Sequence, residues 1–221
     1  MSHNSFRPLV WLQICIFTVF ALNGALATAK DGNEALYDAT APADSAFARV
    51  INLADKTASV KFEGKTAVQT VGAYQVSDYV FFTGGKTQTI EVNGESLVRA
   101  FPTNSAWTLV FADGKLTPIE DKYYQGRKKA QVSFYNLSEQ PLDLKTGDGK
   151  HAVVANVAPM ANGQREINEV RIGLTAWAAS TAAAAFEPTF LKKGRSYSYV
   201  VYPHAGSLKP IVVADAITSL E

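Results

Sequence analysis

Two stretches of the chain resemble each other closely enough to indicate a duplicated structural unit. Residues 46–61 (AFARVINLADKTASVK) align without gaps over residues 130–145 (AQVSFYNLSEQPLDLK). A second gap-free alignment places residues 107–119 (WTLVFADGKLTPI) over residues 199–211 (YVVYPHAGSLKPI). Because the two matches lie at the beginning and the end of one unit, they predict a tandem duplication. The chain is therefore expected to fold as two similar domains.

Within each unit, apolar and polar residues alternate, which is typical of half-buried β-strands. Trp107, Leu109 and Phe111 show this pattern before a turn, with their side chains predicted to point into the core. Asn93-Gly94 lies between two such runs and is a strong hairpin signal. Many short strands separated by turns predict an all-β fold, with two tandem Ig-like or carbohydrate-binding-module-like β-sandwich domains.

Two details of this β-pattern lead to separate expectations. Pro118 and Pro210 occupy matching positions in the two units and predict edge strands or strand ends, because proline has no N–H to donate. The alanine-rich stretch 175–186 allows either a short helix or a strand–loop segment, since alanine favours helix but the stretch has no apolar stripe. The sequence leaves this choice open.

The beginning of the chain has the three parts of a secretory signal peptide. Arg7 precedes an apolar run from Pro8 to Leu22, and small residues with candidate cleavage sites follow it. An uncleaved membrane anchor is the alternative, but the run is shorter than the ~20 apolar residues that span a bilayer. We therefore predict a cleaved signal peptide and a periplasmic location.

These features give a predicted domain organisation. The ranges are a signal peptide at 1–29, an N-terminal β-sandwich at 30–121, a basic linker at 122–129 and a C-terminal β-sandwich at 130–221.

The composition of the mature chain excludes several classes of function. The single cysteine, Cys15, lies in the predicted signal peptide, so the mature protein has no disulfide, thiolate metal site or cysteine nucleophile. Lys and Arg total 21 and Asp and Glu total 20 in the whole chain, and this near neutrality argues against binding of nucleic acid. No cofactor or metal site is predicted.

A D-x-x-H block, Asp148 to His151, raises the question of an acyl-transfer enzyme. SGNH-type esterases carry such a block, but they also need a Gly-Asp-Ser block and a parallel sheet with helices. Ser45 follows Ala-Asp instead, and the chain shows no alternation of strands and helices. Asp148 also belongs to the turn-forming stretch GDGK. We therefore interpret the block as a hairpin turn followed by an exposed histidine.

Three blocks of the mature chain carry a resemblance to a known family. They are EALYDATAPADSAFARVINL (34–53), KKAQVSFYNLSEQPLDLKTGDGK (128–150) and GQREINEVRIGL (163–174). In this order they closely resemble the AlgF family of periplasmic accessory proteins for alginate O-acetylation. The resemblance covers essentially the whole mature chain, although none of the blocks is a recognised catalytic motif.

The resemblance implies a role in adding acetyl groups to the mannuronate residues of alginate in the periplasm. The implied partners are SGNH-like alginate acetyltransferases and a membrane-bound O-acyltransferase. It further implies an adaptor with β-sandwich domains and no chemistry of its own, that is, an accessory subunit rather than an enzyme.

If the role is contact with partners, polar residues at strand edges and loops are the candidates. The sharpest set is Arg165, Glu166 and Asn168, since arginine can grip a carboxylate through two hydrogen bonds. The structural alternative is an Arg-Glu pair that ties down a loop. The second predicted partner-binding set, for which a pinned N-terminal strand is the structural alternative, is Tyr37, Ser45 and Arg49.

Direct binding of alginate is the alternative function, in which the protein acts as a carbohydrate-binding module that presents the polymer. Alginate carries one carboxylate per sugar, so basic and aromatic residues are the candidates. Trp177 is the tryptophan candidate. Trp107 is not chosen, because it is predicted to belong to the core. The remaining candidates lie in the predicted linker: Lys122, Tyr123, Tyr124, Arg127, Lys128 and Lys129. A third hypothesis is an acetyl-carrying enzyme that uses Ser45.

Overall fold

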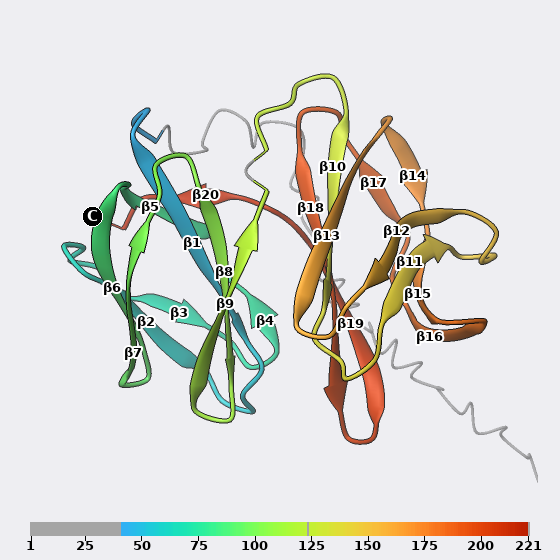
Figure 1. Cartoon of the computed structure of the whole chain (residues 1–221), viewed down its shortest axis with the longest axis horizontal. Coiled ribbons are helices and arrows are strands. Elements are labelled where there is room, and N and C mark those ends of the chain that lie inside the picture. Colours follow the sequence, from blue (N-terminus) through green and yellow to red (C-terminus); the bar gives the residue numbers. More distant parts are fainter. Residues whose placement is uncertain (1–40, 123, 221) are drawn as a thin grey trace, which may run out of the picture. The chain divides into compact units, whose positions relative to one another are not determined.

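The computed structural model describes residues 41–122 and 124–220 of the chain (Figure 1). These residues form β-strands and no helix, which confirms the predicted all-β class. Consequently, none of the described residues belongs to a helix that is long and apolar enough to cross a membrane. The predicted signal peptide, 1–29, lies outside the described residues.

The first β-sandwich contains two sheets. One has the strand order β5-β1-β8-β9, with β4 also pairing with β1, and the other has the order β3-β2-β6-β7. The strands are β1 (Ser45–Asn52), β2 (Ala58–Phe62), β3 (Gln69–Val71), β4 (Gln75–Val76), β5 (Tyr79–Thr83), β6 (Lys86–Val92), β7 (Glu95–Phe101), β8 (Ala106–Ala112) and β9 (Lys115–Asp121).

The second β-sandwich repeats this arrangement. Its sheets have the orders β13-β10-β18-β19 and β12-β11-β15-β16, and β14 pairs separately with β17. The strands are β10 (Ala130–Asn136), β11 (Leu142–Thr146), β12 (Ala152–Val157), β13 (Ala161–Ile167), β14 (Val170–Ile172), β15 (Leu174–Ala178), β16 (Thr181–Ala185), β17 (Thr189–Leu191), β18 (Ser196–His204) and β19 (Ser207–Ala214).

The pairing of the strands shows how closely the two units correspond. β1 runs parallel to β8, and β10 runs parallel to β18. In these registers Asn52 lies opposite Phe111 and Asn136 lies opposite Val201. The gap-free sequence alignment instead places Phe111 over Pro203. The strand register and the sequence alignment differ by two positions because β18 has nine residues and β8 has seven. The turn after β18 therefore comes two residues later, relative to its paired first strand, than the turn after β8.

Local sequence signals explain how several strands end. Asn93 and Gly94 form the two-residue loop between β6 and β7, and both have positive φ, as a primed hairpin turn requires. Pro118 and Pro210 lie on β9 and β19, which are edge strands, as predicted. The alanine-rich stretch forms the hairpin of β15 and β16, so the helical alternative is wrong. Pairing with β11 and packing on the second core outweigh the helical preference of alanine.

Each sandwich has its own core, and a third core lies between them. In β1, Ala46, Ala48 and Val50 face the first core, whereas Ile51 on the opposite face belongs to the third. The third core also contains residues from both sandwiches: Val110, Ile119, Tyr135, Leu137, Val200 and Tyr202. Because successive side chains of a strand point to opposite faces, β1 is buried on both sides.

The end of the chain returns to the first sandwich. β20 (Ile217–Thr218) pairs in parallel with β5, and Leu220 packs against the first core. The predicted C-terminal sandwich, 130–221, includes these residues. β9 ends at Asp121 and β10 begins at Ala130, so the described residues of the predicted linker contain no strand. The predicted domain ranges as a whole stay a prediction.

Candidate functional site

A buried arginine connects the two sandwiches. Only 1% of Arg49 on β1 is exposed. Its Nε donates to Thr108 Oγ1 at 3.0 Å, and its Nη1 donates to Asp215 Oδ1 at 2.7 Å. Its Nη2 donates to the Tyr135 hydroxyl at 2.9 Å and to Ser198 Oγ at 2.7 Å. Because Thr108 lies on β8 while Tyr135 and Ser198 lie on β10 and β18, one guanidinium holds both sandwiches.

Asp121, at the end of β9, accepts hydrogen bonds from both sides of the same junction. Its Oδ2 accepts from Thr108 Oγ1 at 2.6 Å and from the Tyr79 hydroxyl at 2.8 Å. Its Oδ1 accepts from the Tyr135 hydroxyl at 2.7 Å and from Asn162 Nδ2 at 2.8 Å. All four donors are thereby satisfied by one carboxylate.

Asp215 occupies the corresponding place after β19. Its Oδ1 accepts from Ser198 Oγ and its Oδ2 from Ser196 Oγ, each at 2.7 Å, in addition to the ion pair with Arg49. We call the whole set the junction cluster: Arg49, Tyr79, Thr108, Asp121, Tyr135, Asn162, Ser196, Ser198 and Asp215.

The charges of the junction cluster do not balance when both carboxyl groups are ionised. Burial raises the pKa of Asp121, although Arg49 and hydrogen bonds from Thr108, Tyr135 and Tyr79 oppose the rise. Burial acts to lower the pKa of the Arg49 guanidinium, but the Tyr135, Tyr79, Asp215 and Asp121 groups outweigh it and hold that pKa above its ordinary value. Arg49 therefore stays charged, and Asp121 binds a proton more readily than an exposed carboxyl group does.

A pH dependence of stability follows from Asp121. A raised pKa means that the folded protein binds the proton more tightly than the unfolded chain does. The tighter proton binding stabilises the folded protein. This stabilisation is complete below the ordinary pKa of about 4 and is lost as pH rises through the raised pKa of Asp121. We expect the stability advantage of the wild type over Asp121→Asn to be largest in acid and to shrink towards neutral pH. Urea unfolding of both proteins between pH 3.5 and 7 measures it, and an advantage that grows with pH would contradict the assignment.

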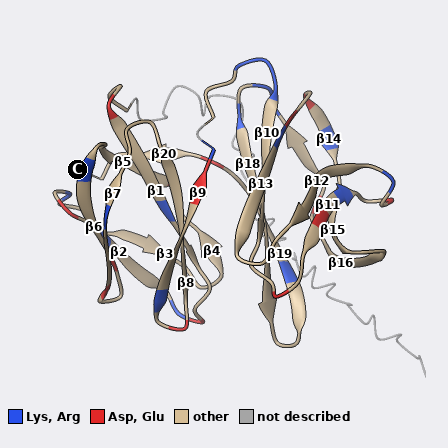
Figure 2. Cartoon of the chain, viewed as in Figure 1, with Lys and Arg blue, Asp and Glu red and all other residues tan. Residues whose placement is uncertain are grey.

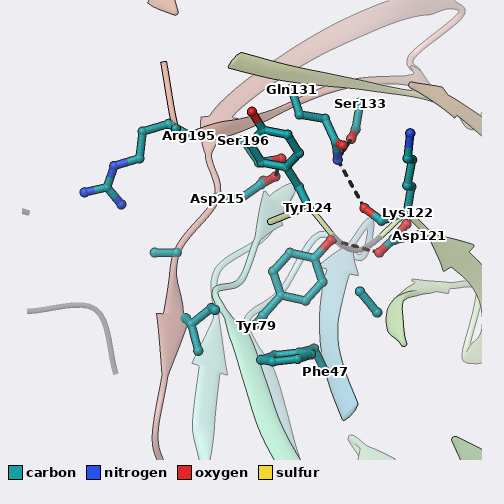
Figure 3. A pocket seen from close by; sticks show the side chains of 14 residues that line it. Phe47, Tyr79, Asp121, Lys122, Tyr124, Gln131, Ser133, Arg195, Ser196 and Asp215 are labelled. Carbon is teal, nitrogen blue, oxygen red and sulfur yellow. Dashed lines mark hydrogen bonds between the residues drawn. The ribbon is translucent and has the colours of Figure 1, made fainter. Parts of the chain in front are cut away.

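A cavity of about 150 Å³ lies beside the junction cluster (Figure 3). Tyr79, Asp121 and Asp215 form part of its wall, and Figure 3 shows the Tyr79 hydroxyl directed at Asp121. Gln131 Nε2 donates to the backbone oxygen of Lys122 at 3.1 Å on another side. The cavity brings Lys122 and Tyr124 of the predicted linker next to the junction.

A second hollow, on the C-terminal sandwich, has a volume of about 550 Å³. We call it the Arg165 groove, and its lining is Lys150, His151, Ala152, Val153, Arg165, Ile167, Asn168, Val170 and Ile172. Arg165 and Asn168 of the sharpest predicted partner-binding set thus lie together. Glu166 points to the other face of β13, where its charge raises the pKa of Tyr124 after the larger effect of burial. The partner-binding role of the three residues stays a prediction.

The D-x-x-H block forms a turn, in agreement with its interpretation from sequence. Asp148 Oδ1 accepts from the backbone N–H of Lys150 at 3.1 Å and also binds the Thr146 hydroxyl. His151 is exposed and precedes β12. Among the described residues, no three His, Cys, Asp or Glu side chains gather as a set that could hold a metal ion.

The other predicted site residues are dispersed. Ser45 is buried at the start of β1, and Arg49 belongs to the junction cluster, so neither presents its side chain on the surface. Trp177 is half-buried on β15, with Lys145 Nζ 5.9 Å from the centre of its ring. Tyr37 and Tyr123 lie outside the described residues. Arg127, Lys128 and Lys129 are exposed on the loop that leads into β10, where Figure 2 shows a run of basic residues.

Most residues of the junction cluster are not predicted as site residues from the sequence. Asp121 and Asp215 lie 94 positions apart in the chain, and each follows a Leu-x-Pro-Ile block, but at different spacings of two and four residues after the isoleucine. One signal was present: Arg49 stands among the apolar residues of SAFARVIN, and the structure buries this strand over its whole length. A buried arginine requires partners, because an unpaired charge in the interior is costly. The sequence does not say which residues supply them.

Comparisons with known proteins identify the family. A family model described as "Alginate O-acetyl transferase AlgF" matches residues 19–198. The chain is 34% identical over 186 residues to the alginate biosynthesis protein AlgF of Pseudomonas putida, covering 84% of this chain and 86% of the relative. It is 32% identical over 208 residues to the AlgF protein of Pseudomonas aeruginosa, covering 94% of each.

A solved structure also resembles part of the chain. It is the C-terminal domain of AlgF from P. aeruginosa, which is 38% identical, with a TM-score of 0.37, and the match covers 39% of this chain and 98% of that domain. The family model spans most of the chain, and the two relatives match along nearly their whole lengths. On these matches, the chain belongs to the AlgF family of alginate biosynthesis proteins.

Proposed function

We propose that this protein is a non-catalytic periplasmic adaptor required for O-acetylation of alginate at its mannuronate residues. It would dock SGNH-like acetyltransferase and membrane-bound O-acyltransferase subunits. Family membership supports a role in alginate O-acetylation, because the relatives are named alginate biosynthesis proteins and the family model is described as an O-acetyl transferase.

The junction cluster is the observation that carries the adaptor role. An adaptor that contacts two partners gains from a fixed spacing between its binding surfaces, since a rigid connection lowers the entropy lost on assembly. Here Arg49 binds side chains of both sandwiches, and a separate apolar core also contains residues from both. β20 adds a backbone connection, because it follows the second sandwich and pairs with β5 of the first.

The polar groups of the junction support the same conclusion from their chemistry. Each hydroxyl of Thr108, Tyr135 and Ser198 accepts from Arg49 and donates to a carboxylate. Such closed networks rigidify a structure. Thr108, Tyr135 and Ser198 are also fully buried, so none of the three presents its hydroxyl on the surface as a nucleophile.

Direct binding of alginate is the second candidate, and one observation favours it. Lys122 and Tyr124 line the cavity beside the junction, and the exposed basic residues Arg127, Lys128 and Lys129 follow in the chain. An NMR titration with mannuronate oligosaccharides separates the two functions. Amide shifts along this loop, reduced by Lys128→Glu, would support the binding module, whereas we expect no shifts at millimolar sugar.

Capture of partner subunits tests the adaptor function directly. We expect the immobilised mature protein to retain the acetyltransferase subunits, and cells lacking the gene to produce alginate with acetyl content near background. Complementation with Ser45→Ala is expected to restore full acetylation, because Ser45 is buried and removal of its hydroxyl leaves the surface unchanged. Failure of Ser45→Ala to restore acetylation would favour the acetyl-carrying hypothesis, and failure of the wild type to retain any subunit would refute the adaptor.

A further inference from the structure

The rim of the Arg165 groove is basic. Lys150, His151 and Arg165 line it, and the carboxylate nearest to Lys150 is that of Asp148, with 3.7 Å between Lys150 Nζ and Asp148 Oδ2. Both side chains of that pair are well exposed, so the pair is weak and a better-placed carboxylate can replace it. Glu166 lies on the opposite face of β13 and does not line the groove. The groove therefore favours an anionic group.

Arg165 is held in position by the backbone of β12. Its Nη1 donates to the carbonyl oxygen of Ala152 at 2.7 Å and lies 3.4 Å from that of Val153. Within residues 41–122 and 124–220, no hydrogen bond or ion pair reaches its Nε or Nη2. One side of the guanidinium is thus anchored while the other can donate two parallel hydrogen bonds. This is the geometry with which arginine recognises a carboxylate.

The remainder of the groove lining is largely aliphatic. Val153, Ile167 and Ile172 contribute to it, and Val170 is 39% exposed on β14. Aliphatic surface of this kind gains free energy when another apolar side chain covers it. A ligand that matches both parts of the groove combines a carboxylate with a neighbouring aliphatic group.

We propose that the Arg165 groove binds an acidic segment of a partner protein, in which an Asp or Glu lies beside an aliphatic residue. The proposal rests on the adaptor function proposed above and assigns one of its binding surfaces. A peptide segment fits better than a uronate polymer, because the polymer offers carboxylates and hydroxyls but no aliphatic side chain for Val170 and Ile172. The volume of about 550 Å³ accommodates a few residues of such a segment.

Binding measurements with groove variants test this assignment. The dissociation constant of each purified acetyltransferase subunit is measured with the mature wild type, Arg165→Gln, Arg165→Lys and Lys115→Gln. Arg165 and Lys115 are both exposed, and Lys115 lies in the first sandwich, so it serves as the matched control. We expect Arg165→Gln to raise the dissociation constant of one subunit about tenfold or more, because a charged hydrogen-bonded pair is lost. Arg165→Lys is expected to lose less affinity than Arg165→Gln. Lys115→Gln is expected to change the dissociation constant less than about twofold.

Hydrogen exchange on the same complex identifies the partner segment. We expect protection of residues lining the groove and of a partner segment that contains an Asp or Glu beside an aliphatic residue. Unchanged binding by Arg165→Gln, or a protected segment without an acidic residue, would overturn the groove assignment while leaving the adaptor function in place. Amide NMR shifts of groove residues on addition of mannuronate oligosaccharides would show that the groove binds the polymer and not a peptide segment. Absence of any binding by the wild type would remove the adaptor function itself.

Discussion

Replacing Arg49 with methionine is expected to lower the free energy of unfolding by about 3–5 kcal/mol, the range for breaking a buried ion pair by removing one partner. Methionine fills much of the volume but leaves Asp215 without its cation and Thr108, Tyr135 and Ser198 without a donor. We also expect the two sandwiches to unfold less cooperatively. Urea unfolding followed by tryptophan fluorescence measures both effects, because Trp107 reports on the first sandwich and Trp177 on the second.

The control for this variant removes an exposed cation from the same sandwich. Lys61 pairs with Glu91 at 2.9 Å, but 58% of the lysine side chain is exposed. Lys61→Met is therefore expected to cost about 0–1 kcal/mol. If Arg49→Met were no more destabilising than Lys61→Met, the junction cluster would not hold the sandwiches together.

Replacing Asn52 or Asn136 with alanine is expected to cost about 2–4 kcal/mol in each case, because buried backbone groups lose their hydrogen bonds. Both side chains are fully buried, and they occupy equivalent positions in the duplicated units. Asn52 Nδ2 lies within hydrogen-bond distance of the carbonyl oxygens of Lys56, Val71 and Gly72 at 2.8–3.1 Å.

Asn136 has the same role in the second sandwich. Its Nδ2 donates to the carbonyl oxygens of Gln140 and Val157, each at 2.8 Å, and its Oδ1 accepts from the backbone N–H of Ser138 at 3.0 Å. Each asparagine therefore secures the loop that follows the first strand of its sandwich. Asn168→Ala is the matched control, because Asn168 is exposed, and we expect it to change stability by less than about 0.5 kcal/mol.

Chemical unfolding of the three variants also tests the connection between the sandwiches. If the junction makes one cooperative unit, Asn52→Ala and Asn136→Ala each shift a single transition seen by both tryptophans. A shift confined to the tryptophan of the altered sandwich would instead show that the two halves unfold independently. If Asn52→Ala or Asn136→Ala were as stable as Asn168→Ala, this would contradict the role assigned to the replaced asparagine.

Local sequence patterns predicted the strands well because their causes are local. Alternation places Trp107, Leu109 and Phe111 on the core face of β8, as the structure confirms. The Asn93-Gly94 hairpin and the edge position of Pro118 depend on backbone dihedrals and missing donors, which neighbouring residues do not alter. The alanine-rich stretch was ambiguous because its strand pairing involves β11, far away in the chain.

The functional surfaces were only partly predictable. Arg165 and Asn168 are close in sequence, so their proximity could be foreseen, but Lys150 and His151 join them only because β12 lies beside β13. Arg49 was selected as a partner-binding residue because polar residues at strand edges and loops are the candidates for contact with partners. The second sandwich covers that face of β1, and the arginine is consequently buried.

The sequence by itself determined the all-β class, the duplicated unit and the family. Short-range alternation of apolar and polar residues indicates the class, and matching blocks of residues indicate the repeat and the family. Only the tertiary structure decided how the units are joined. Tyr135 and Ser198 alternate with core residues and, in an isolated sandwich, would face solvent. Their burial beside Arg49 depends on contacts between residues separated by 86 and 149 positions, which no local pattern encodes.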